Sequence, residues 1–221
     1  MAAERVVVSG EGLVSTDPAS TFTALGLRAY RLDGPPADCA TDSGGEYPVT
    51  YGCPAWAVAV EGTSMTAPVV SDDLATVVVG TDAGLVYAIS EATGSVLWTA
   101  NVGSAVTADP GIAGDTDLVP TAADGLVALP LAGCGAPSCA PAWTSASPAG
   151  VAQQPVAAGG AVFVGHDGGV LAAYPVGGCG SATCDPVWST PLGGDFDGPM
   201  AIGSGHLLVT VDSVMHAFTP G

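Results

Sequence analysis

Short apolar runs alternate with turn residues along most of the chain. Between residues 64 and 102, APVV is followed by SDDLA, TVVVG by TDAG and LVYAIS by EATG, and SVLWTANV ends the unit. Each run has four to eight residues, is rich in β-branched and aromatic side chains, and is bounded by Gly, Asp or Ser. Such runs are typical of antiparallel strands joined by hairpin turns. The pattern therefore predicts a unit of four short strands.

This unit recurs along the chain with an almost constant step. The tryptophans are Trp56, Trp98, Trp143 and Trp188, at spacings of 42, 45 and 45 residues. Three further ladders keep the same step: Pro68, Pro110, Pro155 and Pro199; Asp82, Asp124, Asp167 and Asp212; and Ala88, Ala128, Ala173 and Ala217, with Asp17 and Ala29 as a looser first copy. A period near this length marks a propeller blade, and such blades bury their faces only by packing against one another. We therefore predict an all-β propeller of four-stranded antiparallel blades, in which each tryptophan packs against the next blade.

The repeat divides the chain into five units within one predicted domain, residues 1–221. The units are residues 1–62, 63–102, 103–147, 148–191 and 192–221. The three middle units are complete, whereas the first lacks its leading proline strand and the last stops before a tryptophan strand, so both are predicted to be three-stranded. Ring closure usually completes one blade from both ends of a chain, but these ends duplicate their middle strands. We therefore expect part of a seven- or eight-bladed ring, or an unusual five-bladed one.

One unit carries a recognisable motif, AISEATGSVLW at residues 88–98. It resembles the tryptophan-docking motif of the PQQ-like β-propeller family, A-x-D-x-x-T-G-x-x-x-W. Ala88, Thr93, Gly94 and Trp98 match, and Ser90 replaces the aspartate. The family includes quinoprotein dehydrogenases, the propeller lipoprotein of the outer-membrane barrel assembly machine, and sensor or scaffold domains of bacterial receptor kinases. Because one fold serves all of these, the resemblance predicts the architecture and leaves the function open.

The charge balance narrows the classes of partner. The chain has 21 acidic residues and three cationic ones, Arg5, Arg28 and Arg31, for a net charge of −18. Nucleic acids and anionic lipid surfaces are bound chiefly by Lys and Arg, so neither is expected as a partner. The longest apolar run, PAWAVAV at residues 54–60, is far shorter than the ~20 residues that span a bilayer, so we expect no direct membrane insertion. The N-terminal sequence does not resemble a signal peptide, so any export signal is expected outside this chain.

The enzymatic alternative suggested by the family is a PQQ-dependent dehydrogenase. PQQ carries three carboxylates that require Arg, Lys or many backbone donors, and the chain has no Arg or Lys after residue 31. Family enzymes also hold the cofactor with calcium through Glu, Asn and Asp, whereas Asn101 is the only asparagine here. There is no GxSxG motif, and the histidines, His166, His206 and His216, fall in or beside predicted strands. We predict no catalytic residues and no resident cofactor, with the dehydrogenase as the runner-up.

Two pairs of aspartates are candidate calcium ligands. They are Asp115 with Asp117, in GDTD, and Asp195 with Asp197, in DFDG. Calcium needs six to eight oxygen ligands, and neither pair approaches a complete calcium loop. The first pair falls in the same hairpin position as Asp72 and Asp73, which predicts that it forms a turn. Weak calcium binding remains the alternative.

The six cysteines form three pairs, each followed closely by a tryptophan. The pairs are Cys39 with Cys53, Cys134 with Cys139, and Cys179 with Cys184. Because Gly94 stands four residues before Trp98, we predict that the second cysteine takes the place of this turn glycine and that each pair spans the loop between the third and fourth strands. Such a loop brings two Cα atoms to the ~5.5 Å of a disulfide. Structural disulfides are favoured over a zinc site or a redox dithiol, both of which stay open.

These features combine into one functional hypothesis. Structural disulfides imply an oxidising compartment, so the chain is expected outside the cell, on its surface or in the periplasm. We predict a non-catalytic binding or scaffolding propeller with a protein or small-molecule partner, which uses turns such as TDAG, AADG and GHDGG as surface elements. A fragment of a PQQ-dependent dehydrogenase and the sensor domain of a receptor kinase are the alternatives.

Overall fold

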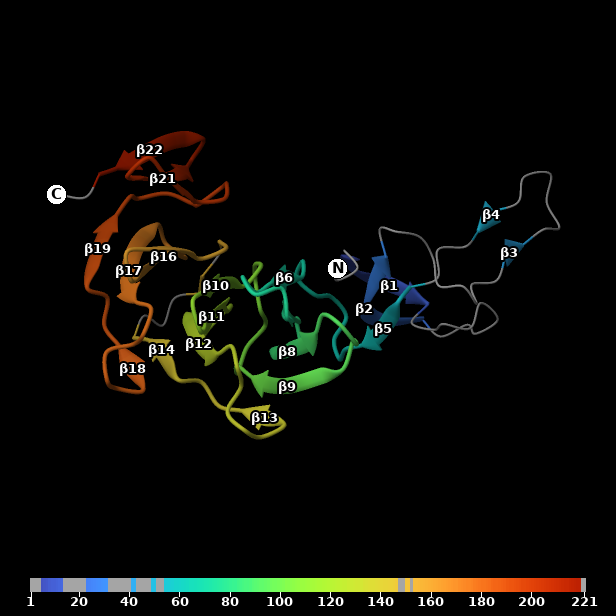
Figure 1. Ribbon diagram of the computed structural model, residues 1–221. Coiled ribbons are helices and arrows are strands. Elements are labelled where there is room, and N and C mark those ends of the chain that lie inside the picture. Colours follow the sequence, from blue (N-terminus) through green and yellow to red (C-terminus); the bar gives the residue numbers. More distant parts are fainter. Residues whose placement is uncertain are drawn as a thin grey trace.

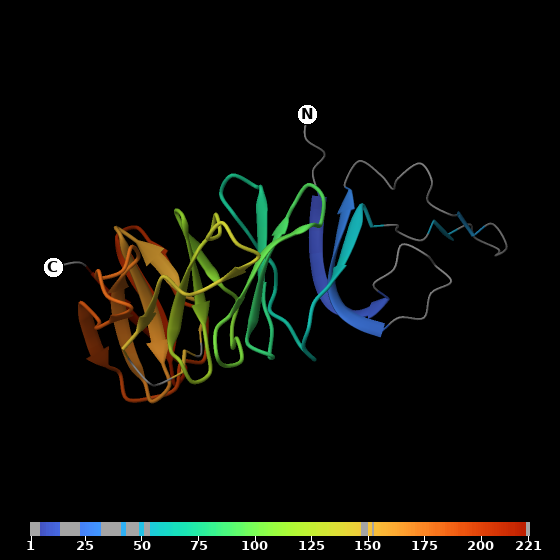
Figure 2. The same cartoon turned by 90° about the horizontal axis from the view of Figure 1, so that it is seen from below.

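The structure is a computed structural model that describes residues 5–13, 23–31, 41–42, 49–50, 54–146, 150–151 and 153–219. The described residues form strands, turns and bends without a helix, which confirms the predicted all-β class. Correspondingly, no helix in these ranges could cross a membrane. The main sheets follow one another side by side in a curved row, with β1 and β2 at one end and β21 and β22 at the other (Figures 1 and 2). The two ends do not meet, so the propeller is open.

Three sheets in the middle of the row each have four antiparallel strands in sequence order. Sheet II contains β6 (Val69–Val70), β7 (Thr76–Gly80), β8 (Leu85–Ser90) and β9 (Val96–Asn101). Sheet III contains β10 (Gly111–Ala113), β11 (Thr116–Pro120), β12 (Leu126–Pro130) and β14 (Trp143–Ser145). Sheet IV contains β15 (Val156–Ala158), β16 (Ala161–His166), β17 (Val170–Pro175) and β19 (Trp188–Pro191).

The sheets at the two ends of the row have three strands each. Sheet I contains β1 (Arg5–Leu13), β2 (Thr23–Arg31) and β5 (Trp56–Ala59). Sheet V contains β20 (Ala201–Gly203), β21 (His206–Val211) and β22 (Val214–Phe218). A separate short hairpin is formed by β3 (Thr41–Asp42) and β4 (Val49–Thr50). The described strands of sheet V therefore include no partner on the outer edge of β22.

Apolar side chains fill the space between each sheet and the next. Because successive residues of a strand point to opposite faces, Val77 and Val79 belong to the cluster between sheets I and II, whereas Val78 belongs to the cluster between sheets II and III. All three side chains are fully buried. The continuous apolar runs of the sequence are therefore strands that are buried on both faces.

Strand register explains the alanine and tryptophan ladders. In sheets I to IV each ladder alanine lies directly opposite the tryptophan of the neighbouring strand: the pairs are Ala29 with Trp56, Ala88 with Trp98, Ala128 with Trp143, and Ala173 with Trp188. Residues opposite one another on antiparallel strands have side chains in contact. A small residue at the alanine position leaves room for the indole ring on the same face.

Three of the tryptophans also reach across to the following sheet. Each indole N–H donates to a backbone carbonyl there: Trp56 to Glu91 at 2.7 Å, Trp98 to Leu131 at 3.0 Å, and Trp143 to Val176 at 3.1 Å. A buried indole N–H needs such an acceptor, because leaving it unpaired costs free energy. The tryptophan ladder thus joins sheet I to II, II to III, and III to IV.

A glycine with positive φ lies under each of these indoles. Gly94, Gly133 and Gly178 have φ values of +73°, +81° and +78°, and a Cβ at any of them would lie within 2.8 Å of the tryptophan ring. Cys134 and Cys179 directly follow two of these glycines. The prediction that the second cysteine replaces the turn glycine is therefore wrong. Only glycine fits under the indole, and the cysteine loop is inserted after it.

The aspartate ladder fixes the segment that leads into each sheet. The carboxylates of Asp82, Asp124, Asp167 and Asp212 lie so close to Gly62, Gly103, Gly150 and Gly194 that a Cβ on any of these glycines would approach within 3.0 Å. Asp82 accepts hydrogen bonds from the Thr63 N–H at 2.8 Å, the Ser64 N–H at 3.1 Å and the Thr63 hydroxyl. These bonds, the Thr63 hydroxyl above all, lower the pKa of Asp82 to about 2. The TDAG turn therefore has a structural role, because its aspartate holds the segment that leads into sheet II.

Two disulfides close the loops between the third and fourth strands of sheets III and IV. Cys134 is bonded to Cys139 and Cys179 to Cys184, with Cα atoms 5.6 and 5.7 Å apart. Both sulfur atoms of each pair are used in the bridge, so neither pair offers thiolates to a metal or to redox exchange. Cys39 and Cys53 lie outside the described residues. Two of the three predicted bridges are therefore present.

Each disulfide loop also covers the edge of the preceding sheet, which the sequence did not predict. Residues of β13 (Ser138–Cys139) pair in parallel with β9, and β18 (Thr183–Cys184) pairs in parallel with β14, so sheets II and III gain a fifth strand. The N–H of Thr99 donates to Pro137 O, and that of Thr144 donates to Ala182 O, both at 2.9 Å. A covered edge offers no free strand for unwanted pairing. The loops therefore clasp one sheet to the next (Figure 1).

Removal of the Cys134–Cys139 bridge is expected to loosen this clasp. The double substitution Cys134→Ser and Cys139→Ser should lower the free energy of unfolding by ~2 kcal/mol, because the bridge restricts the unfolded chain. It should also speed amide exchange at Thr99, whose N–H bonds to the loop. The matched variant Cys179→Ser with Cys184→Ser should instead speed exchange at Thr144. Hydrogen exchange followed by mass spectrometry would measure the exchange rates of both amides in both variants. If either variant sped exchange at Thr99 and Thr144 equally, the interpretation that each loop holds its own sheet would be contradicted.

Candidate functional site

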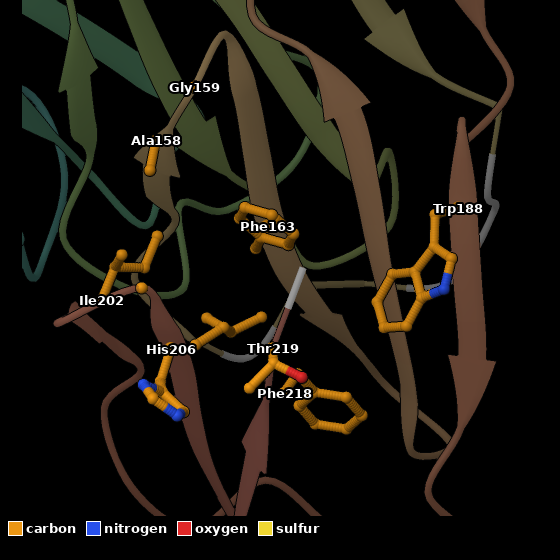
Figure 3. Close-up of a pocket in the computed structure, with 10 residues that line it drawn as sticks. Ala158, Gly159, Phe163, Trp188, Ile202, His206, Phe218 and Thr219 are labelled. Carbon is orange, nitrogen blue, oxygen red and sulfur yellow. The ribbon is translucent and has the colours of Figure 1, made fainter. Parts of the chain in front are cut away.

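An apolar pocket lies between sheets IV and V, where the described residues provide no tryptophan strand (Figure 3). Its volume is about 460 Å³, and it is lined by Ala158, Gly159, Phe163, Trp188, Ile202, Gly205, His206, Leu207, Phe218 and Thr219. The lining comes from β15, β16 and β19 on one side and from β20, β21 and β22 on the other. The pocket thus lies where two successive sheets separate.

Trp188 differs from the other three ladder tryptophans. Its exposed fraction is 40%, whereas Trp98 and Trp143 are 3% exposed and Trp56 is 6% exposed. Its ring meets the Phe218 ring edge to face, with centroids 5.8 Å apart. Figure 3 shows Trp188, Phe163 and Phe218 around the pocket, with Ile202 and His206 on its other side. In sheets I to III the ladder tryptophan is buried against the next sheet. In sheet IV the ladder tryptophan, Trp188, is instead part of an accessible aromatic surface.

The lining residues set limits on the chemistry of this pocket. His206 is the one titratable side chain among them, and its Nδ1 lies 2.9 Å from the carbonyl oxygen of Ser204. The lining holds no Arg, Lys, Asp or Glu. A cofactor with three carboxylates would find no cation there, so these residues do not fit PQQ. Aromatic and aliphatic walls with a few polar edges suit an apolar side chain.

The first aspartate pair is not the turn that the sequence suggested. Asp115 lies in the turn before β11, but Asp117 lies within β11 and is completely buried. Neither carboxylate oxygen of Asp117 has a hydrogen-bond partner. Burial raises the pKa of Asp117 from 3.8 to about 8, and the neighbouring Leu118 N–H, which is too poorly placed for a hydrogen bond, lowers it by much less. The predicted turn role of Asp117 is wrong, because β11 already begins at Thr116 and Asp117 is its second residue.

The second aspartate pair forms hydrogen bonds with the turn between β21 and β22. Asp197 accepts a hydrogen bond from the Ser213 N–H at 2.6 Å, and the N–H of Asp195 donates to Asp212 at 3.2 Å. Within the described ranges there is no group of three His, Cys, Asp or Glu side chains that could hold a metal ion. The Asp197 carboxylate and the Asp195 backbone N–H thus both hold the DFDG segment in its loop.

The three histidines have separate surroundings. His166 is buried between sheets III and IV, and its Nε2 lies 3.0 Å from the Tyr174 hydroxyl. Burial raises the pKa of Tyr174, a bond with Ser145 lowers it by less, and Asp185 adds to the rise. His206 lines the pocket, and His216 is half-buried on β22. The structure therefore does not bring the histidines together.

The aromatic members of the pocket were missed at the sequence level. Phe163 and Phe218 each lie in an ordinary apolar strand run, with nothing in their spacing to set them apart. Trp188 was predicted as a blade-docking residue like the other ladder tryptophans, so its exposure was not predicted either. Only the positions of sheets IV and V show which side chains share that uncovered space.

Comparison with known proteins agrees with the predicted family resemblance. The model of the family described as outer membrane protein assembly factor BamB matches residues 49–133. The crystal structure of BamB from Moraxella catarrhalis is 25% identical and superposes with a TM-score of 0.63, covering 76% of this chain and 50% of that one. The chain therefore spans about half the length of that protein. The resemblance to PQQ-like propeller repeats is confirmed.

Two other solved structures show the range of similar folds. The computationally designed protein Ika8 is 12% identical with a TM-score of 0.60, covering 90% of this chain and 57% of that one. Quinohemoprotein alcohol dehydrogenase from Comamonas testosteroni is 20% identical with a TM-score of 0.43, covering 59% of this chain and 21% of that one. No curated protein sequence matches this chain. The first likeness concerns the fold alone, and the second is too weak to support an argument about function.

Proposed function

We propose that this chain is a non-catalytic binding or scaffolding propeller that holds an apolar side chain of a polypeptide partner in the pocket between sheets IV and V. The observation that carries the proposal is the exposed aromatic surface of Trp188 and Phe218 beside a cavity of about 460 Å³. The other three ladder tryptophans are buried and donate hydrogen bonds to the following sheet. Trp188 is left available to a ligand.

The shape of the site favours a polypeptide over a free small molecule. The outer edge of β22 lies beside the pocket, and no described strand pairs with it. A peptide can add to such an edge through main-chain hydrogen bonds while one side chain enters a neighbouring pocket. Edge and pocket together therefore suit an extended segment with an aromatic or large aliphatic residue.

The dehydrogenase alternative has weaker support. The apolar lining does not fit a tricarboxylate cofactor, and the two cations whose side chains are described, Arg28 and Arg31, lie on β2 at the opposite end of the row (Figure 1). A binding role also agrees with the likeness to BamB, which is described as an assembly factor. On this proposal residues 1–221 form one propeller domain with five repeat units.

The proposed location is outside the cytoplasm. The two disulfides suit an oxidising compartment such as the periplasm or the exterior of the cell. The likeness to an outer membrane assembly factor supports the same compartment. The disulfides also hold the clasp loops in place and so make them less open to proteolysis, which suits an exported protein.

Substitution of Ile202 is expected to weaken peptide binding without unfolding the protein. Ile202 lines the pocket and is 37% exposed, so Ile202→Asp places a carboxylate in the apolar site at little cost to the core. Probe peptides would carry one Trp, Phe or Leu within a polar sequence, and Trp188 fluorescence would report binding. We expect the variant to bind at least about tenfold more weakly, the factor that 1.4 kcal/mol represents.

The control for this experiment is Leu74→Asp. Leu74 is exposed in the turn between β6 and β7, far from the pocket along the row, so its substitution should leave the affinity unchanged. Equal weakening by both variants, or no binding of any probe peptide, would contradict the proposed site. A rise in melting temperature on addition of PQQ and Ca²⁺ would instead favour the dehydrogenase alternative.

A further inference from the structure

The two clasp loops, residues 134–139 and 179–184, present their disulfides to solvent in the same way. The first cysteine of each bridge, Cys134 or Cys179, is exposed. The second cysteine is buried, with exposed fractions of 4% for Cys139 and 0% for Cys184. In thiol–disulfide exchange a thiolate attacks one sulfur of the bridge, and access decides which sulfur it reaches. A thiol from outside the chain therefore meets the first cysteine of each bridge.

The space around each exposed cysteine is open. A glycine follows it in both loops, and a Cβ on Gly135 or Gly180 would meet no atom within 4 Å. Beside the first loop there is also a cavity of about 420 Å³, which is lined by Leu97 of β9 and by Ala136 and Pro137 of the loop. The loop therefore stands away from the sheet here instead of packing closely against it, and a small thiol has room to approach.

The buried cysteine of each bridge is the better leaving group. The backbone N–H of Cys134 donates to Cys139 Sγ, and that of Cys179 donates to Cys184 Sγ, both at 3.0 Å. A hydrogen bond of this kind stabilises the negative charge that the sulfur takes up when the S–S bond breaks. Exchange is faster when the leaving thiolate is stabilised. Exposure and hydrogen bonding thus favour the same direction, with attack at the first cysteine and departure of the second.

We propose that both clasp loops are sites of thiol–disulfide exchange with a dithiol reductant, which attacks the first cysteine and releases the loop from the preceding sheet. A thiolate of the reductant bonds to Cys134 Sγ, the bond to Cys139 breaks, and Cys139 Sγ leaves with the electron pair. The second thiolate of the reductant then attacks the reductant's own sulfur in the mixed disulfide, and Cys134 Sγ leaves. The reductant supplies two electrons and two protons and becomes a disulfide. The bridge is the electrophile throughout, so the chain needs no free thiolate.

Cleavage releases the clasp because the bridge lies at the strand that covers the sheet edge. Cys139 belongs to β13 on the edge of β9, and Cys184 belongs to β18 on the edge of β14. Each of these covering strands has only two residues, and an opened loop regains conformational freedom that opposes their pairing. Reduction therefore uncovers the N–H groups of Thr99 and Thr144, and reoxidation covers them again. The β9 edge is in sheet II, away from the pocket between sheets IV and V, so its release is independent of peptide binding there.

The position of attack is tested with 2-mercaptoethanol, a neutral monothiol that a chain of net charge −18 does not repel. N-ethylmaleimide blocks the released thiol, digestion with pepsin at acidic pH stops further exchange, and tandem mass spectrometry locates the mixed disulfide. We expect at least about tenfold more adduct on Cys134 than on Cys139, and the same preference for Cys179 over Cys184. Equal adducts on the two cysteines of a bridge, or more adduct on the buried one, would overturn the proposal.

The rate of reduction shows whether the bridges react in the folded protein. Dithiothreitol is added with and without a denaturing concentration of urea, and mass spectrometry follows each bridge. Because the first sulfur is already accessible, we expect the folded protein to be reduced at a rate within about tenfold of that of the unfolded chain. A larger difference between the two rates would overturn the proposal, because the bridges would then be reached only after unfolding.

Hydrogen exchange decides whether reduction releases the clasp alone. The variant Cys179→Ser with Cys184→Ser keeps the first bridge, so reduction with dithiothreitol should speed amide exchange at Thr99 at least about tenfold and leave the amides of β21 unchanged. Removal of dithiothreitol and reoxidation should restore the slow exchange at Thr99. Unchanged exchange at Thr99 would show that the bridge does not hold the loop, and faster exchange in β21 would show general unfolding. Either result would overturn the proposed release.

Discussion

The substitution Asp117→Val is expected to raise the free energy of unfolding by ~4 kcal/mol at pH 7, which is large for a single residue. Asp117 is completely buried in β11 and has no hydrogen-bond partner for either carboxylate oxygen. The matching strand positions in sheets II and IV are held by Val77 and Val162, both fully buried. Valine therefore has a place of suitable shape, and it removes a polar group whose burial is uncompensated.

The pH dependence of this effect has a definite sign. Burial raises the pKa of Asp117 from 3.8 to about 8 in the folded protein, so the folded state retains a proton that the unfolded chain loses above pH 3.8. Stability falls with rising pH wherever the folded state binds more protons than the unfolded state. The contribution of Asp117 is therefore most favourable below about pH 4 and is lost progressively until about pH 8. Above that pH the penalty stays constant.

Chemical denaturation at a series of pH values between 4 and 9 would measure this prediction. The wild-type protein should lose stability across the range, and Asp117→Val should remove most of that slope. Asp117→Asn should also remove the slope but give less stabilisation, because an amide remains buried. Asp115→Val, in the exposed turn two residues earlier, serves as the control and should change little. An unchanged slope in Asp117→Val would show that Asp117 is not the group responsible.

The substitution Trp98→Ala is expected to lower the free energy of unfolding by ~3–5 kcal/mol. Trp98 is 3% exposed, lies opposite Ala88, donates to Leu131 O at 3.0 Å, and packs against Gly133 of the next sheet. Truncation removes the largest side chain between sheets II and III and leaves the Leu131 carbonyl without its donor. The lost contacts belong to two sheets, so the cooperativity of unfolding should fall as well.

Trp188→Ala provides the matched control for this experiment. Trp188 holds the same position in sheet IV and lies opposite Ala173, but it is 40% exposed. Its removal should cost less than ~2 kcal/mol, because much of its surface is already in water. Thermal and urea unfolding of both variants would compare the two positions. Equal losses would contradict the interpretation that docking onto the following sheet stabilises the fold.

Much of the fold could be predicted because the repeat makes each residue type appear several times in the same place. Four tryptophans, four alanines and four aspartates in phase indicate strands, turns and inter-sheet packing. Asp117 was misjudged because GDTD resembles the turn containing Asp72 and Asp73, and a shift of one or two residues moves a side chain from a solvated turn to a buried strand. The cysteine loops were placed between the correct strands, but their attachment to the preceding sheet was not foreseen.

The sequence by itself determined the period, the all-β class, the disulfide partners of Cys134 and Cys179, and the absence of cations from the later sheets. These features depend on spacing and composition, which are local properties of the chain. Only the tertiary structure decided that β13 and β18 clasp neighbouring sheets, that Asp117 lacks a partner, and that Trp188 opens into a pocket. Each of these depends on contacts between residues far apart in the chain, and such contacts arise only when the sheets are packed together.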